Sequence, residues 1–317
     1  MNSKNKYLVT GSNGCIGSWV VKQLSNDGQE IVALDQSRNK YRIELLLDQE
    51  SLSNIKFVNA DITDSELIKK IILEESPTYI IHLAALQVPF CKANPILGSK
   101  VNVLGTINIF EAVKEAGDII QGLSYASSRA VYGLNRDSLP STLYGAFKKT
   151  NELTARIYWE DYGISSVGIR PYTVYGVGRD QGLTSDPTKA ILAAVLDKSY
   201  NISFSGEVGM NYTQDVARIF IEAAKSNKED AILCNINKEI ISIENFIGLI
   251  NNYIPNANIT YNKNLKLPFP VSVDDSTLYE TLDTVPFTPL SQGIKLTLSL
   301  FKDLTDNNLI NVDQLNS

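Results

Sequence analysis

The sequence contains a single histidine, His82, and this scarcity limits the chemistry that the protein can perform. His82 stands at the end of an apolar segment that reads as a buried strand, where a hydrogen-bonded core histidine is the more common role. A Ser/His/Asp hydrolase and a histidine-based metal site are therefore disfavoured. We expect no bound metal.

Cysteine and excess basic charge are also in short supply. Cys15, Cys91 and Cys234 lie far apart, without the paired spacing of a metal site or a disulfide framework. We expect reduced thiols that pack as small hydrophobic residues in a cytoplasmic protein. A net charge of −6 and a pI near 5.0 oppose binding to a phosphate backbone, so nucleic acid is not an expected partner.

Long apolar runs are missing as well. The first predicted strand begins at residue 7, which leaves no room for the apolar segment of a signal peptide. No run approaches the roughly 20 apolar residues that span a bilayer. The sequence therefore predicts neither a secretion signal nor a membrane span.

What the sequence does contain is a repeating pattern over its first 170 residues. Short apolar runs alternate with longer amphipathic stretches, as in βαβ units around a parallel sheet. The predicted strands are residues 7–10, 31–35, 55–61, 79–85, 119–127 and 166–171. The predicted helices between them are 15–28, 64–76, 102–117 and 144–163.

The pattern is less regular after Pro171. Residues 174–190 are rich in Gly, Thr, Ser and charge and read as a loop. We expect residues 172–317 to form mostly a smaller substrate-binding lobe, with some segments returning to the first domain, residues 1–171. The tail from residue 306 is expected to be frayed. The later predicted elements are helices at 187–198, 213–226 and 290–303 and strands at 202–204 and 232–236.

Three glycines follow the first predicted strand and open a helix. Gly11, Gly14 and Gly17 form GxxGxxG, where glycine permits a tight turn and close approach of a pyrophosphate to the backbone. Asp35 ends the second strand, 18 residues after Gly17, where a carboxylate can bind ribose hydroxyls. A doubly wound sheet of the Rossmann type that binds NAD is predicted, although a purely structural turn would leave the same three glycines.

Two nearby residues have two readings each. Arg38 could accept the extra phosphate of NADP or be a solvated surface residue. Asp61 ends the third strand, where it could meet the adenine edge or cap the helix that follows. The carboxylate of Asp35 favours NAD over NADP.

Tyr144 and Lys148 are spaced i, i+4, so both project from one face of the predicted helix. A neighbouring ammonium favours the phenolate and lets a tyrosine act as a general base. Ser128 follows the fifth predicted strand, at the carboxyl edge where ligands of open α/β sheets bind. Its hydroxyl could hold the substrate oxygen while Tyr144 takes the proton.

With these motifs in order, the chain resembles the extended short-chain dehydrogenase/reductase family, the NAD-dependent epimerases and dehydratases of sugar metabolism. The resemblance covers essentially the whole chain. It rests on GxxGxxG (11–17), Asp35, D-I (61–62), H-L-A-A (82–85), N-V-x-G-T (102–106), S-S-x-A-V-Y-G (127–133), Y-x-x-x-K (144–148), R-P-Y-x-V-Y-G (170–176), D-V-A (215–217) and T-P-L-x-x-G-I (288–294).

The resemblance implies the roles of the site residues. Ser128, Tyr144 and Lys148 would be catalytic, and Lys148 would also hold the nicotinamide ribose. For Asn102 and Tyr132, local packing is an equal alternative to a role in the site. The implied cofactor contacts are Gly11, Asn13, Gly14, Cys15, Ile16, Gly17, Asp35, Asp61, Ile62, Leu83, Ala84, Ala85, Asn102, Tyr144, Lys148, Pro171 and Thr173. The implied substrate contacts are Gln87, Ser128, Arg129 and Arg179.

The sequence departs from two patterns within that family. Dehydratases carry an Asp-Glu pair after the catalytic Ser or Thr, and here those positions hold Arg129 and Ala130, which disfavours a 4,6-dehydratase. Members that act on nucleotide sugars present an arginine just before the D-V-A helix, and residues 207–214 contain none. Arg179 is then the best candidate to bind an anion, with a surface role as the alternative. A smaller sugar or sugar acid is left open.

Two reactions therefore compete. A sugar or nucleotide-sugar epimerase would regenerate NAD, whereas a net dehydrogenase of a small sugar, sugar acid or polyol would release NADH. We place the epimerase slightly ahead. A catalytically idle NAD sensor fits less well, because Ser128, Tyr144 and Lys148 are all present. The resemblance also implies a homodimer through the helices near 95–115 and 143–162, where Ile107, Phe110, Val113, Ile157 and Tyr158 could serve the interface or the core.

Overall fold

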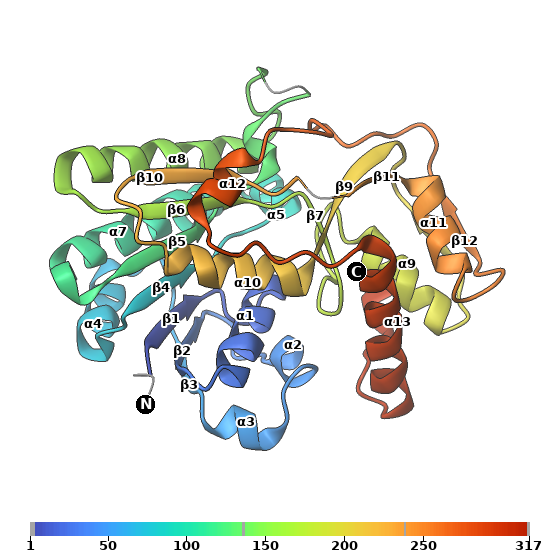
Figure 1. The fold of residues 1–317 in the computed structure, drawn as a ribbon, viewed down its shortest axis with the longest axis horizontal. Coiled ribbons are helices and arrows are strands. Elements are labelled where there is room, and N and C mark those ends of the chain that lie inside the picture. The colour runs from blue at the N-terminus through green and yellow to red at the C-terminus, as the bar shows by residue number, and fades with distance from the viewer. Residues whose placement is uncertain (1–3, 135–136, 238, 316–317) are drawn as a thin grey trace.

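A seven-stranded parallel sheet forms the centre of the protein, whose structure is a computed structural model that describes residues 4–134, 137–237 and 239–315 (Figure 1). The strand order is β10-β6-β5-β4-β1-β2-β3, and each neighbouring pair runs parallel. Apart from the added β10, this is the Rossmann order, and the predicted fold class is confirmed. The strands are β1 (Lys6–Thr10), β2 (Glu30–Asp35), β3 (Lys56–Asn59), β4 (Tyr79–His82), β5 (Gly122–Ala126), β6 (Ser166–Arg170) and β10 (Ala231–Asn235).

Helices cover both faces of this sheet because its strands point alternate side chains into two apolar cores. Tyr7 and Val9 of β1 face one core, and Leu8 between them faces the other. The first core is closed by α1 (Cys15–Asn26) and α10 (Thr213–Ala224). The second core is closed by α4 (Ser65–Glu75), α7 (Gly105–Ala116) and α8 (Leu143–Tyr162).

Helix α8 has clear start and stop signals in its sequence. The Thr142 side chain accepts a hydrogen bond from the Gly145 N–H, which caps the first turn. Gly163 ends the helix at φ 68°, a left-handed conformation that glycine adopts without strain. Tyr144 and Lys148 therefore lie in the first two turns, as the i, i+4 spacing predicts.

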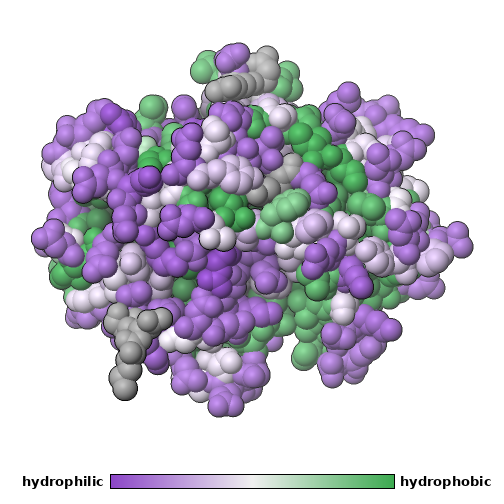
Figure 2. All heavy atoms as spheres, viewed as in Figure 1, coloured by the Kyte–Doolittle hydropathy of each residue, from purple (hydrophilic) through white to green (hydrophobic). Residues whose placement is uncertain are grey.

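The later residues build a smaller lobe beside the sheet and also return to it. β10 extends the central sheet and α10 packs against β4, β5 and β6. In the view of Figure 2 the surface is largely hydrophilic, with hydrophobic side chains gathered in small groups. The lobe contains a three-stranded sheet of β7 (Thr173–Tyr175), β9 (Glu207–Tyr212) and β11 (Ile240–Ser242), a two-stranded sheet of β8 (Tyr200–Ile202) and β12 (Ile259–Tyr261), and helices α9 (Asp186–Val195), α11 (Ile243–Asn251) and α13 (Leu290–Asp306).

The prediction of a loop over residues 174–190 is wrong at its start, because Val174 and Tyr175 belong to β7. At its end the loop gives way to α9, Asp186–Val195, which confirms the helix predicted at 187–198. Strand β7 has only three residues and is held by pairing with β9, more than 30 residues later, so no local alternation marks it. The strand predicted at 202–204 also lies earlier, at Tyr200–Ile202, where it pairs with β12.

The tail prediction is wrong for the described part of the tail. The Tyr41 hydroxyl donates to the Leu309 carbonyl at 3.3 Å and accepts from the Asn311 N–H at 2.9 Å. These bonds dock the tail beside the short helix α2 (Tyr41–Glu44), and a 3-10 turn follows at Val312–Leu315. The remaining short helices are α3 (Gln49–Ser53), α5 (Val88–Ala93), α6 (Pro95–Ser99) and α12 (Ser276–Thr281).

Helices α6 and α7 are joined through a π-helical turn, Lys100–Leu104, into one helical stretch, Pro95–Ile119. By length and composition alone this stretch could cross a membrane, although the sequence analysis predicts no span. Half of the most apolar 18-residue segment of this stretch is buried within the protein, as in a core helix. Phe110 and Val113 belong to the second core, whereas Ile157 of the neighbouring α8 is exposed.

The cysteines only partly follow the prediction of buried hydrophobic packing. Cys91 and Cys234 are free thiols and fully buried, which confirms it for them. Cys15 is a free thiol and is partly exposed, because it opens α1 beside the glycine loop. Its position is set by the loop rather than by the core.

Gly17 tests the packing between α1 and the loop. A Cβ there would meet the Gly11 carbonyl oxygen and the Ser12 Cα inside contact distance, so Gly17→Ala should lower the free energy of unfolding by about 1–3 kcal/mol. Gly248→Ala is the matched control, because a Cβ there has open space within α11 and alanine favours a helix by up to about 1 kcal/mol. Urea unfolding measures both. Equal stability of Gly17→Ala and the wild type would contradict the close contact.

Candidate active site

A cavity of about 200 Å³ opens where the strand order reverses, at the carboxyl ends of β1 and β4. Ligands of doubly wound sheets bind at this crevice. Its walls bring together the glycine loop, the three predicted catalytic residues and Phe269 from the later lobe. The predicted site residues that line it are Gly11, Gly14, Cys15, Ile16, Gly17, Leu83, Ala85, Gln87, Ser128, Arg129, Tyr144, Lys148, Pro171 and Arg179.

The glycine loop has the geometry that a dinucleotide pyrophosphate requires. Gly11 has φ 69° and lies so close to the Ala84 backbone that a Cβ would come within 2.7 Å of its nitrogen. The Gly14 N–H donates to the Gly11 carbonyl at 3.0 Å and closes the turn. The N-cap of α1 is Gly14, which has no side chain to cap the helix, so the first N–H groups of α1 can bind an anion. These residues fit the pyrophosphate of NAD.

Asp35 supports the loop from the end of β2. Its two carboxylate oxygens accept from the Asn13 N–H at 3.0 Å and the Ser37 N–H at 2.8 Å. Asn13 and Asp35 line an open groove next to the central cavity. Arg38 lies outside the lining of this groove, and its Nε donates to Asn59 at 3.3 Å on the surface. This placement agrees with the surface reading of Arg38.

Asp61 and Ile62 line a further pocket with Asp35 and Ala84, where an adenine would lie. Asp61 also bonds the chain around it, accepting from the Thr63 N–H and hydroxyl at 2.9 Å and from the Gln36 side chain at 3.1 Å. The cap of α4 is Asp64, not Asp61. The helix-capping alternative for Asp61 is therefore wrong.

Asn102 braces the loop after β4. Its side chain accepts from the Leu86 N–H at 2.7 Å and donates to the Leu86 carbonyl at 2.9 Å. It does so from the π-helical turn, a feature common at functional sites. Asn102 lies outside the lining of the central cavity and holds the backbone at Leu86, next to Ala85 of the cavity wall.

His82 is buried below this loop and fully hydrogen-bonded. Its two ring nitrogens lie 2.8 Å from the Thr10 hydroxyl and 3.1 Å from the Thr106 hydroxyl. Burial, with the Lys148 charge as a smaller cause, lowers the pKa of His82 to about 3 and keeps the ring neutral. The reading of His82 as a satisfied core histidine is confirmed.

Ser128, Tyr144 and Lys148 reach the cavity from two elements. Ser128 follows β5 and its hydroxyl accepts from the Ala130 N–H at 3.1 Å, while Tyr144 and Lys148 come from α8. Burial raises the pKa of Tyr144, and a hydrogen bond with the Ser128 side chain and the charge of Arg179 act in the opposite direction. The Lys148 ammonium lies 5.8 Å from the centre of the Tyr144 ring. The three groups therefore line one cavity.

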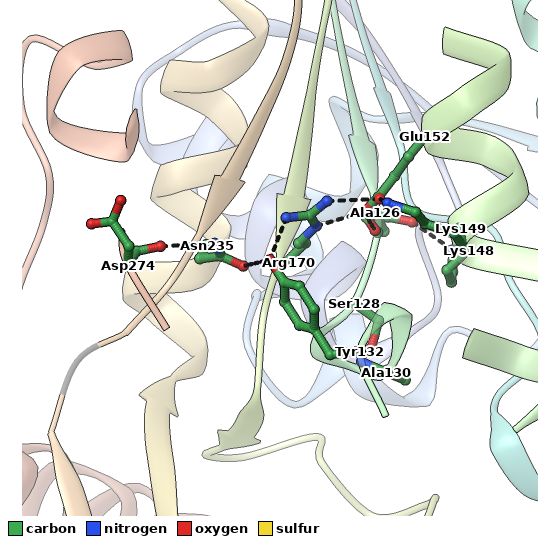
Figure 3. A network of polar contacts seen from close by, with 11 residues as sticks. Ala126, Ser128, Ala130, Tyr132, Lys148, Lys149, Glu152, Arg170, Asn235 and Asp274 are labelled. Carbon is green, nitrogen blue, oxygen red and sulfur yellow. Dashed lines mark hydrogen bonds and ion pairs between the residues drawn. The ribbon is translucent and has the colours of Figure 1, made fainter. Parts of the chain in front are cut away.

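Lys148 is almost completely buried. Its ammonium donates to the Ala126 carbonyl at 2.6 Å, at the end of β5 (Figure 3). Burial lowers its pKa to about 8, although the Cys91 and Glu152 side chains oppose this. The protein therefore holds a cation in an interior that disfavours the charge.

The sequence reasoning missed a buried ion pair behind these residues (Figure 3). Glu152 accepts from Arg170 Nε at 2.6 Å and from its terminal nitrogen at 2.7 Å, and from the Ser127 hydroxyl at 2.5 Å. Arg170 also donates to the Tyr132 hydroxyl at 2.7 Å. The only local signal is that Glu152 lies one turn after Lys148 on the same face of α8. These contacts, with the Tyr132 hydroxyl 3.4 Å from Asn235 Oδ1, agree with local hydrogen bonding and packing as the role of Tyr132.

A second ion pair that the sequence analysis did not predict, Arg42 with Asp180, lies beside the glycine loop. Arg42 of α2 bonds both carboxylate oxygens of Asp180, with a shortest distance of 2.6 Å, and donates to the Asn13 carbonyl at 3.0 Å. Arg179, next to Asp180, donates to Gln87 at 3.4 Å and to Thr184 at 3.0 Å. The loop 178–181 therefore links the cofactor groove to the central cavity.

Two of the predicted site residues, Thr173 and Arg129, are deeply buried. Thr173 is buried within β7 and is not part of the cavity lining, although its neighbours Tyr172 and Val174 are. Arg129 lines the cavity but is almost fully buried, with bonds to backbone carbonyls rather than to a carboxylate. Among the described residues, no group of three or more His, Cys, Asp or Glu side chains is placed to hold a metal ion.

Comparison with known proteins places the chain in a family. Residues 7–236 match the NAD-dependent epimerase/dehydratase family. The chain belongs to this family, which is of the extended short-chain dehydrogenase/reductase type, and it is an enzyme of that class.

Individual relatives share about a third of their residues with the chain over the matched segments. The chain is 32% identical to Protein CapI of Staphylococcus aureus over 244 residues, 71% of this chain and 72% of that protein. It is 33% identical to UDP-glucuronate 4-epimerase 4 of Arabidopsis thaliana over 226 residues, 67% of this chain and 52% of the plant protein.

Solved structures share the fold across nearly the whole chain. The UDP-glucose 4-epimerase of Thermotoga maritima superposes with a TM-score of 0.82 at 23% identity, covering 95% of this chain and 99% of that one. The L-threonine dehydrogenase of Clostridium difficile gives a TM-score of 0.81 at 23% identity, covering 95% and 98%.

Lys148→Met should make the protein more stable. A pKa lowered from 10.5 to about 8 means that burying the charge costs about 3 kcal/mol below pH 8, of which the lost hydrogen bond to Ala126 returns roughly 1. We expect a gain of about 1–2 kcal/mol in the free energy of unfolding at pH 7. The gain should shrink as pH rises from 8 to 10.5, where the unfolded state also loses its proton.

Urea unfolding of the variant at pH 7 and pH 10 measures this effect. Lys149→Met is the matched control, because Lys149 is half-exposed and pairs with Glu152 at 3.3 Å, so its loss should bring no gain. A Lys148→Met protein that is less stable than the wild type at pH 7 would show that the ammonium is well compensated.

Proposed function

We propose that this protein is an NAD-dependent oxidoreductase that acts on a secondary alcohol of a sugar or nucleotide sugar, with Tyr144 as general base. The observation that carries the proposal is that Ser128, Tyr144 and Lys148 face one cavity whose other wall is the glycine loop. The family supports NAD as the cofactor. The catalytic and cofactor residues predicted from the sequence are proposed in these roles.

NAD would be held by the glycine loop at its pyrophosphate, by Asp35 at the adenosine ribose and by the pocket of Asp61 and Ile62 at the adenine. When bound, NAD supplies a hydride acceptor and a positive charge near the cavity. Lys148 would hold the nicotinamide ribose, and Pro171 would flank the nicotinamide. Within the fold, residues 172–317 would supply mostly the substrate side, through Arg179 and Phe269.

The protein residues then move one proton. The Ser128 hydroxyl donates a hydrogen bond to the substrate oxygen and fixes its position. Tyr144 removes the hydroxyl proton as the carbon loses hydride. Burial alone raises the pKa of Tyr144, so the nearby Lys148 ammonium and the Arg179 charge are needed to favour the phenolate.

Tyr144→Phe tests this assignment. Removal of the general base should lower turnover by about 10²–10⁴-fold and leave NAD affinity within a few-fold of the wild type. Tyr158→Phe is the control from the same helix, because the Tyr158 hydroxyl bonds Glu111, away from the cavity. Unchanged turnover in Tyr144→Phe would contradict Tyr144 as the general base. NAD binding without turnover of any substrate by the wild type would favour a catalytically idle NAD sensor.

The reaction type is decided by following nicotinamide absorbance and product isomers together. Accumulation of NADH with one substrate indicates a net dehydrogenase, and isomer conversion without it indicates an epimerase. The named relative UDP-glucuronate 4-epimerase supports the epimerase. The dehydrogenase has its own support, because residues 207–214 lack an arginine for a diphosphate and the threonine dehydrogenase shares the fold.

We also propose a cytoplasmic homodimer. The support is that α8 and the π turn, which pack against each other, carry exposed apolar side chains, namely Leu153 and Ile157 on α8 and Leu104 on the π turn. Ile157→Glu with Leu153→Glu should give a monomer that light scattering detects, because burying two unpaired charges opposes association. A wild-type monomer at micromolar concentration would contradict the dimer.

A further inference from the structure

The central cavity is lined by three cations and no carboxylate. Arg129, Lys148 and Arg179 all belong to its wall, whereas none of the described residues that line it is Asp or Glu. This contrasts with the net charge of −6 of the whole chain. The cavity is therefore suited to anionic ligands, of which the NAD pyrophosphate is only one.

Arg129 is the most buried of these cations and sits on the substrate side. Its exposed fraction is 1%, and its guanidinium lies 4.9 Å from the centre of the Tyr172 ring. Tyr172 in turn meets Phe269 edge to face, with ring centres 6.3 Å apart. Arg129 thus forms a wall with two aromatic rings of the cavity, directly after Ser128 in the chain.

The hydrogen bonds of Arg129 involve backbone carbonyls and leave one nitrogen without a partner. Two terminal nitrogens donate to the Ile236 carbonyl at 2.9 Å and the Pro270 carbonyl at 3.3 Å. The buried Nε of Arg129 has no hydrogen-bond partner among the described residues. Within the described chain no carboxylate oxygen lies within 4.0 Å of it, and Asp275 acts only at longer range.

Two other arginines differ from Arg129 because each forms an ion pair with a carboxylate. Arg170 pairs with Glu152 and Arg42 pairs with Asp180, each through two nitrogens. A buried cation without such a partner is costly, and burial indeed lowers the pKa of Arg129 to about 10. An anion that enters with the substrate would supply the missing charge.

We propose that Arg129 is a specificity residue that binds an oxyanion of the substrate, the carboxylate of a small hydroxy acid or sugar acid. This rests on the proposed function, because the carboxylate must lie near the alcohol that Ser128 and Tyr144 receive. A phosphoryl group shares the same chemistry, and the experiment separates the two.

The test measures binding by calorimetry to the protein loaded with NADH, so that alcohols bind without being oxidised. The probes are acids and their neutral counterparts: D-glucuronate with D-glucose, D-galacturonate with D-galactose, D-gluconate with D-glucitol. UDP and inorganic phosphate are the phosphoryl probes. We expect at least one acid to bind about 30-fold or more tighter than its neutral counterpart, and more tightly than either phosphoryl probe.

Variants of Arg129 and Phe269 then test which side chain causes the preference for acids over neutral sugars. Arg129→Met should abolish the acid preference, and Arg129→Lys should keep part of it, because it retains the charge but loses the planar fork. Phe269→Leu changes the same wall without changing charge, so it should weaken acids and neutral sugars equally. If Arg129→Met fails to fold, the acid preference of Arg129→Lys is compared with that of Phe269→Leu. This comparison still separates an effect of charge from an effect of cavity shape.

Three results would overturn the proposal. They are equal binding of acids and neutral sugars by the wild type, an acid preference that survives Arg129→Met, and tight binding of UDP that depends on Arg129. None of these measurements needs turnover. Failure of the proposed function would appear instead as loss of NADH binding or as unchanged turnover in Tyr144→Phe.

Discussion

The buried carboxylate of Glu152 ties helix α8 to the ends of β5 and β6. It accepts hydrogen bonds from Arg170 at the end of β6 and from Ser127 at the end of β5. Lys148 lies one turn before Glu152, and Ser128 follows Ser127. The ion pair of Glu152 and Arg170 therefore fixes the distance from Ser128 to Tyr144 and Lys148 on α8. Removal of either partner of this pair would leave an uncompensated charge in the interior.

Five cations in and around the site fall into two groups with different surroundings. Arg170 and Arg42 are paired with carboxylates and hold elements together. Lys148, Arg129 and Arg179 line the cavity, and no ion pair is seen for them among the described residues. The cavity of an acidic protein thus contains three positive side chains, and the positive end of the α1 dipole adds to their charge. Electrostatic attraction of anions to the cavity follows from this arrangement.

The part of the site that the sequence predicts well is the part encoded by local spacing. Gly11 to Gly17 between a strand and a helix, and Tyr144 with Lys148 four residues later, need no tertiary information. Glu152 could not be recognised in this way, because a glutamate on a helix is usually solvated until an arginine is known to lie opposite. The partner of Arg42 is 138 residues away, so no local pattern connects them.

The fold shows the same division. Strands of the central sheet have apolar runs of their own and were found to within a few residues. Strand β7 has three residues and exists because β9 pairs with it, and the tail is ordered because Tyr41 reaches it. Such elements are specified by contacts between distant segments, which composition alone describes as loop or frayed end.

The loop 178–181 shows how cofactor and substrate binding are coupled in this architecture. Asp180 bonds Arg42, which also holds the Asn13 carbonyl of the glycine loop. Arg179 beside it lines the central cavity and lies close enough to influence the pKa of Tyr144. A shift of the glycine loop on pyrophosphate binding would therefore reach Arg179 through two hydrogen-bonded contacts. The positive charge that lowers the pKa of Tyr144 therefore comes from the same loop that borders the open groove beside the glycine loop.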